Sequence, residues 1–115
     1  MVVATVIVTV LLAALFTFSS SIKLLSVRQS IAIRDHLGVT PTQWRLIGLL
    51  ELAGVIGVLA GLTWPPIGVT AAIGLALLSI GAVISHVRAS DGAIETAPAA
   101  IGIALAVATA VLQAI

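Results

Sequence analysis

Glu51 is the side chain of this 115-residue sequence whose type and position best suit proton chemistry. It follows Trp44 by seven residues, which places its carboxyl about 10 Å further along a helix axis, inside an apolar stretch. An acidic group at that depth in a membrane helix is protonated, paired or facing an aqueous cavity, and it often marks a functional site. A buried ion pair that only fixes helix packing is the alternative interpretation, and the sequence leaves both open.

His86 is the second candidate for chemistry. It lies near the end of another apolar stretch, where an imidazole can serve as a ligand or a proton shuttle. The simpler interpretation is an interfacial side chain that keeps its polar tip in water. In the catalytic hypothesis, Glu51 is the acid or base acting on a lipid-soluble substrate, and His86 or Lys23 completes the proton relay.

Other polar side chains near these residues predict a ligand pocket at one membrane face. Counted from the turn at residues 64–66, Ser79 lies opposite Glu51 on an antiparallel neighbour, and His86 lies about 10 Å further along. Long basic side chains at helix ends commonly reach the headgroups, but Lys23 or Arg88 can instead bend inward to pair with Glu51. The predicted pocket consists of Lys23, Glu51, Ser79, Ser85, His86 and Arg88, with Ser20 and Ser21 in its wall.

The remaining inventory of side chains excludes several classes of site. Cysteine is absent and only two histidines are present, so no thiolate, haem or zinc site can be assembled, and we predict no metal and no cofactor. The net charge is +1 without a basic cluster, which excludes nucleic acid as a partner. We expect His36 to be a surface residue, and Asp91 and Glu95 to be solvated charges beside a helix start.

The elements that must position these residues are membrane helices. Hydrophobic residues make up 61 % of the chain and charged residues 8 %, against roughly 25 % charged in an ordinary soluble domain. A crossing needs about 20 mainly apolar residues. The uncharged run after Glu51, residues 52–85, is too long for a single crossing, and two prolines at 65–66 divide it into two. The predicted spans are residues 2–23, 44–63, 67–88 and 98–115, with Pro98 in the first turn of the last span.

A short amphipathic helix is predicted between the first two spans. Its apolar residues recur at near-helical spacing, at Leu24, Val27, Ile31 and Leu37. Gly38 and Pro41 end it. The predicted fold is an all-α integral membrane four-helix bundle with this helix lying along the interface, in a single domain of residues 1–115.

The charge distribution predicts the orientation in the membrane. All five Lys and Arg residues lie in or beside the connections 24–43 and 89–97, on one side of the predicted bundle. The positive-inside rule places both loops in the cytoplasm. The chain is then a multi-pass protein of the inner (plasma) membrane with both termini outside.

Three segments resemble one family of membrane proteins. The second span carries GLLELAGVIGVLAGL at 48–62, the third ends in GAVISHVR at 81–88 before Ala97-Pro98-Ala99, and the first closes on Lys23-Leu24-Leu25. In this order they resemble the signature of the DoxX-like family of small four-helix bacterial membrane proteins. Ser19-Ser20-Ser21 departs from that pattern, because small apolar residues or glycine are more usual there.

The resemblance implies the four-helix fold and, residue by residue, a site at Lys23, Glu51 and His86. Some members of the family are named as subunits associated with a quinol oxidase or with thiosulfate oxidation, and others accompany redox-stress partners. The overall plan is also similar to that of four-helix sterol isomerases and lipid-binding proteins, which keep acidic and His side chains in an intramembrane pocket. That similarity is an analogy of fold.

Two classes of function follow. We expect an accessory or binding subunit for an apolar small molecule, a lipid or quinone, or for a membrane redox complex contacted through small-residue faces such as Gly54, Gly57 and Gly61. The alternative is the membrane enzyme with Glu51 and His86. A channel or transporter fits less well, because the chain has one polar cluster on one side and no helix broken at the midplane, unless it forms a homo-oligomer.

Overall fold

The computed structural model describes all residues from 1 to 115 and consists of helices and short turns. Four helices are long and apolar enough to cross a membrane, and a short helix lies between the first two of them, which confirms the predicted fold class. The helices are α1 (Val2–Leu24), α2 (Arg28–Leu37), α3 (Pro41–Ala60), α4 (Pro65–Arg88) and α5 (Ala93–Ala114).

The ends of the helices follow from local capping. The side-chain oxygen of Thr40 accepts from the Gln43 backbone N–H while the Gln43 side chain accepts from the Thr40 N–H, so α3 begins at Pro41, ahead of the predicted Trp44. Gly38 ends α2 in a left-handed conformation with φ 74°, as glycine readily does.

Prolines account for two other differences from the predicted spans. Helix α4 begins at Pro65 because the first helical residues need no intrahelical N–H donor. Helix α5 begins at Ala93, after Gly92, so Pro98 lies inside the helix rather than in its first turn. Glu95 in the first turn favours this earlier start, since a negative charge stabilises a helix N-terminus.

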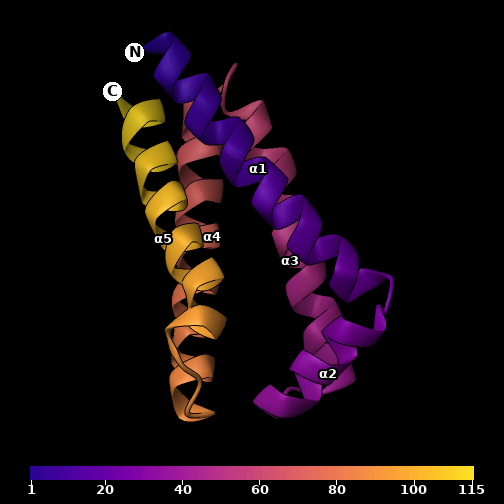
Figure 1. Ribbon diagram of the computed structural model, residues 1–115. Helices are drawn as coiled ribbons and strands as arrows, with labels where there is room; N and C mark the ends of the chain where they lie inside the picture. Colours follow the sequence, from indigo (N-terminus) through magenta and orange to yellow (C-terminus); the bar gives the residue numbers. More distant parts are fainter.

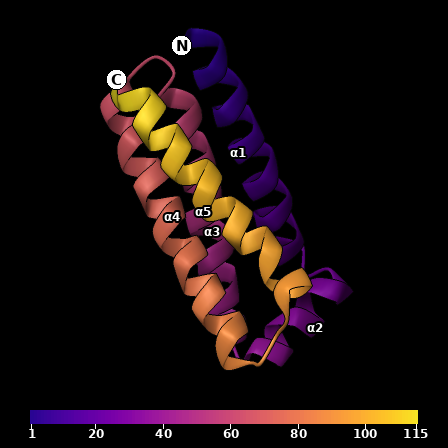
Figure 2. The same cartoon turned by 60° about the vertical axis from the view of Figure 1, so that its left-hand side comes forward.

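The four long helices pack as a ring in which α1 contacts α3 and α5, and α4 contacts the same two helices (Figures 1 and 2). Both termini lie at one end of the bundle, and α2 and the α4–α5 turn lie at the other (Figure 1). The buried apolar core draws on all four, with residues Leu12, Ala13, Phe16, Val55, Val58, Ala72, Leu75 and Ala106. Large apolar side chains also cover the outer faces, as expected where lipid is the solvent.

Gln113 of α5 closes the end of the bundle that holds the termini. Its amide nitrogen donates to Thr9 Oγ1 of α1 at 3.2 Å and to the carbonyl of Val58 on α3 at 3.1 Å. Its amide oxygen occupies the space that a Cβ at Gly61 or Gly68 would need. Glycine at both positions therefore lets α3 and α4 approach closely around one polar side chain.

The opposite end of the bundle, which carries α2, is packed less tightly. The last buried residue of α4 is Ser79 and the first of α5 is Gly102, so the parts of both helices nearest their connecting turn bury no residue fully. Figure 1 shows the α4–α5 pair diverging from α1 and α3 toward this end. We call it the open end.

Candidate functional site

Lys23 and Glu51 form the most deeply buried ion pair of the bundle. Lys23 lies in the last turn of α1 and Glu51 midway along α3. Lys23 Nζ is 2.8 Å from Glu51 Oε1, and the two side chains are 12 % and 4 % exposed. The expectation that Lys23 reaches the headgroups is therefore wrong, and the inward-turned alternative holds.

Trp44 and Ser19 hold the Lys23 ammonium in this position, and Ser30 in turn holds Trp44. Nζ lies 4.9 Å from the centre of the Trp44 ring, a cation–π distance, and it donates a hydrogen bond to Ser19 one turn back along α1. The Trp44 indole N–H donates to Ser30 Oγ of α2 at 2.8 Å, and Ser30 is fully buried. The cluster thus connects α1, α2 and α3.

The Glu51 carboxylate makes no polar contact beyond its ion pair with Lys23. Its Oε1 atom is buried, and the Lys23 ammonium lies 2.8 Å from it. An ionised carboxylate offers about four lone-pair positions, and buried polar groups are normally hydrogen-bonded. Glu51 therefore retains acceptor capacity inside the bundle.

Ser79 and His86 lie on the inward row of α4. Ala72, Leu75 and Ser79 are buried at spacings of three and four residues, and the same spacing leads on to His86. The Ser79 hydroxyl makes no hydrogen bond and lies against Gly102 of α5.

The other two predicted pocket residues lie apart from this row. Ser85 donates to the Gly81 carbonyl of its own helix at 3.0 Å. Arg88 is exposed and makes no ion pair. The structure thus brings Lys23 and Glu51 into contact, and aligns Ser79 and His86 on one row, without joining Ser85 or Arg88 to them.

His86 contacts Asp91 and not Glu51. His86 Nδ1 is 2.6 Å from Asp91 Oδ2, and His36 Nε2 of α2 is 2.6 Å from Asp91 Oδ1. This bridge ties α2 to the turn between α4 and α5. The hydrogen bonds from His86 and then His36 lower the pKa of Asp91 below its ordinary value of 3.8.

The sequence profile of the DoxX-like family matches residues 7–109. The chain belongs to this family. The match covers the Lys23–Glu51 pair, His86 and Asp91, and it ends before Gln113. No functionally curated protein and no solved structure matches the chain.

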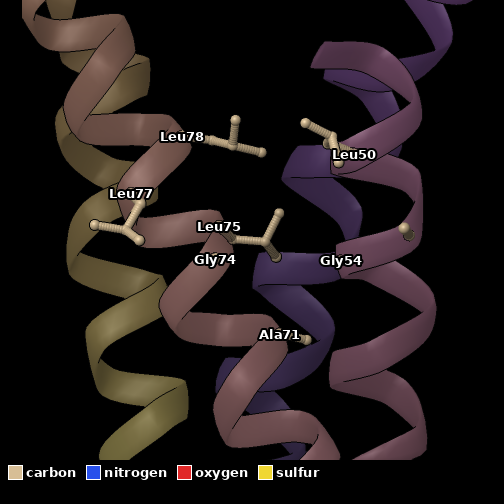
Figure 3. Close-up of a pocket in the computed structure, with 8 residues that line it drawn as sticks. Leu50, Gly54, Ala71, Gly74, Leu75, Leu77 and Leu78 are labelled. Carbon is tan, nitrogen blue, oxygen red and sulfur yellow. The ribbon is translucent and has the colours of Figure 1, made fainter. Parts of the chain in front are cut away.

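An apolar groove runs between α3 and α4 of this DoxX-like protein, with a volume of about 470 Å³. Leu50 and Leu78 face each other across it, while Leu75 points toward Gly54 (Figure 3). The side chain of Leu75 fills the space that a Cβ at Gly54 would need. None of the six predicted pocket residues lines this groove, although Leu50 directly precedes Glu51.

Sequence reasoning missed two parts of the site. His36 and Asp91 are far apart in the sequence, and only the packing of α2 under the α4–α5 turn brings them together. Asp91 follows the helix that carries His86 by a few residues, a spacing that could have suggested their contact. Ser30 gave no signal, because its bond to Trp44 depends on the angle between α2 and α3.

The polar groups of this DoxX-like protein are not arranged to hold a metal ion. The two imidazoles contact different oxygens of Asp91. No group of three or more His, Cys, Asp or Glu side chains has the proximity that a metal ion needs. Hydrogen bonding and acid–base exchange are the chemistry that these side chains can provide.

Proposed function

We propose that this DoxX-like protein binds an amphiphilic small molecule of the lipid or quinone class. The polar head lies at the Lys23–Glu51 pair, and the apolar tail lies along the α3–α4 groove. The observation that carries the proposal is Glu51, which is 3 % exposed and whose carboxylate has no polar partner beyond Lys23. Such a group inside an apolar bundle is a functional-site hypothesis by default.

Two features of the surrounding helices support this placement. The helices diverge at the end where Lys23 lies, so a head group that enters from this end displaces few packed side chains before it reaches the pair. The groove begins at Leu50, and its volume of about 470 Å³ lies within the roughly 300–1,000 Å³ typical of small-molecule sites. Its apolar lining suits an acyl or isoprenoid chain.

The proposal includes an orientation and a set of partners. The positive-inside rule places the open end, with loops 24–43 and 89–97, in the cytoplasm and both termini outside. The remaining small-residue faces suit contact with subunits of a membrane redox complex or with a second copy of the chain. A reporter fused in the loop at Arg34 that proves to be outside would overturn this orientation.

The alternative function, acid–base catalysis by Glu51 and His86, requires proton transfer between these two residues. A relay from Glu51 to His86 needs a path for the proton, and each residue has its own partner, Lys23 and Asp91 respectively. The binding proposal needs only Glu51 and its surroundings. We therefore place Glu51 in the binding site and His86 in the bridge below it.

Native mass spectrometry of the protein released from a gentle membrane extract tests the proposal. We expect one small apolar molecule per chain in the wild type, and its loss from Glu51→Gln. Glu95→Gln is the matched control, because Glu95 is an exposed carboxylate in the first turn of α5. Equal retention in all three proteins, or no bound molecule in the wild type, contradicts the proposal.

A further inference from the structure

The hydrogen-bonding capacity left free around Glu51 defines the kind of head group that this site can hold. We infer that the Lys23–Glu51 site selects ligands whose head donates a hydrogen bond, such as an alcohol, a phenol or the dihydroxy form of a quinone. Heads that only accept hydrogen bonds, such as ethers, esters and oxidised quinones, bind more weakly. The inference rests on the proposed function and specifies its ligand.

The Lys23 ammonium has no donor left for a ligand. An ammonium carries three N–H donors. One donates to Ser19, one side of the ammonium faces Glu51 at 2.8 Å, and another faces the Trp44 ring at 4.9 Å. A head group that accepts hydrogen bonds therefore finds no free N–H on this lysine.

Two neighbouring donors are also occupied. The Trp44 indole N–H donates to Ser30, and the hydroxyl of the buried Ser20 donates to the Thr17 carbonyl of its own helix. The Glu51 carboxylate remains, and it can only accept. The Ser19 and Ser30 hydroxyls accept in their bonds to Lys23 and Trp44 and keep their O–H groups, so the site offers one charged acceptor beside neutral hydroxyl donors.

A donor head group gains more here than it would in water. The carboxylate is desolvated and has unfilled lone pairs, so a ligand hydroxyl supplies a hydrogen bond that the protein alone does not make. Hydrogen bonds to charged groups are among the stronger ones, which predicts about a 10- to 100-fold preference for a hydroxyl over its methyl ether. An acceptor-only head places an oxygen against the carboxylate, which disfavours binding.

Ser79 is the one hydroxyl on the inward row of α4 that makes no hydrogen bond, so it could serve an acceptor head. Ser79→Ala separates the two modes of binding. If Glu51 recognises the head, this variant keeps most of its affinity for the hydroxyl ligand. If Ser79 does so, the variant loses that affinity.

The experiment measures apparent dissociation constants by native mass spectrometry of the full chain in detergent. The probes are two matched pairs: farnesol with its methyl ether, and decylubiquinol with decylubiquinone under anaerobic conditions. We expect the hydroxyl member of a pair to bind about 10- to 100-fold more tightly, and the pair that shows this preference tells an aliphatic alcohol from a phenol. Glu51→Gln should bind all four probes weakly and without this preference, because its amide is uncharged and both donates and accepts.

Each outcome bears on a different claim. Equal binding within both pairs overturns the donor-selective inference and leaves the binding proposal standing. Absence of binding by all four probes overturns both. The wild-type comparison decides the inference even where Glu51→Gln fails to fold.

Discussion

Lys23 Nζ lies 2.8 Å from Glu51 Oε1, and this contact fastens the end of α1 to the middle of α3 inside an apolar bundle. Both side chains are largely buried, and Trp44 and Ser19 contact the Lys23 ammonium. Two charges in such a place depend on each other, because either one alone would be buried without compensation. The remaining acceptor capacity of Glu51 gives the pair a role beyond packing.

Removal of one partner of this pair should destabilise the bundle strongly. Lys23→Met leaves the Glu51 carboxylate buried without its counter-charge, which costs about 3–5 kcal/mol of unfolding free energy. Unfolding by SDS titration in mixed micelles measures the loss. Arg88→Met is the control, since Arg88 is exposed and unpaired, and it should change stability by less than about 0.5 kcal/mol. Equal stability of the two variants would show that the ion pair is not needed.

The Trp44–Ser30 bond should hold α2 in place. Ser30→Ala removes the acceptor of a buried indole N–H, which should cost about 1–3 kcal/mol of unfolding free energy. The double variant Ser30→Ala with Trp44→Phe removes the orphaned donor as well. If loss of the Trp44–Ser30 hydrogen bond causes the destabilisation, Ser30→Ala should change the unfolding free energy by close to zero when Trp44 is already phenylalanine.

A larger residue at Gly61 should destabilise the bundle, because α3 and α4 pack closely at Gly61 and Gly68. Gly61→Ala places a methyl group against the amide oxygen of Gln113 and the backbone of Gly68, and should cost about 1–3 kcal/mol of unfolding free energy. Gly81→Ala is the matched control on the same bundle, because nothing lies within 4 Å of the added carbon. That control should be neutral or stabilising by up to about 1 kcal/mol, as for glycine in a helix interior. If Gly61→Ala is as stable as the wild type, α3 and α4 do not pack as closely at Gly61 and Gly68 as described.

The Asp91 bridge should weaken in acid. A carboxylate with a lowered pKa stabilises the folded state above its ordinary pKa of 3.8, and this contribution disappears as the pH falls through the lowered value. The difference in melting temperature between wild type and Asp91→Asn should therefore be present at pH 5 to 7 and shrink below about pH 4. Circular dichroism of both proteins in detergent measures it. A difference that persists unchanged into strong acid would show that ionised Asp91 is not the stabilising species.

Much of the fold could be predicted from the sequence because it depends on length and hydropathy. Mainly apolar runs of span length and the prolines at 65–66 define the four crossings, and Gly38 marks the end of α2. The exact helix starts needed side-chain detail, such as the reciprocal bonds of Thr40 and Gln43. The predicted helix start near Pro98 is wrong, because a proline that is compatible with a first turn lies here inside the helix.

The site was harder to predict because it depends on contacts between helices. Glu51 could be singled out by its depth alone, whereas the inward turn of Lys23 depends on Ser19 and Trp44 being there to receive the ammonium. The bridge from His36 through Asp91 to His86 joins residues of three elements, whose proximity follows from the tilt of the helices. The depth of a residue along a helix can be calculated from the sequence of that helix alone, but the tilt of one helix against another cannot.

The central claim is that the Lys23–Glu51 pair binds a ligand and is not only a structural element. The double variant Lys23→Met with Glu51→Leu tests it most directly, because apolar residues of similar volume often replace a buried ion pair without loss of stability. The measurement is native mass spectrometry of this variant from a gentle membrane extract, after circular dichroism has shown that it remains helical and cooperative on heating. Our account predicts a folded bundle that carries no small molecule, whereas a folded double variant that retains the wild-type molecule at full occupancy would contradict it.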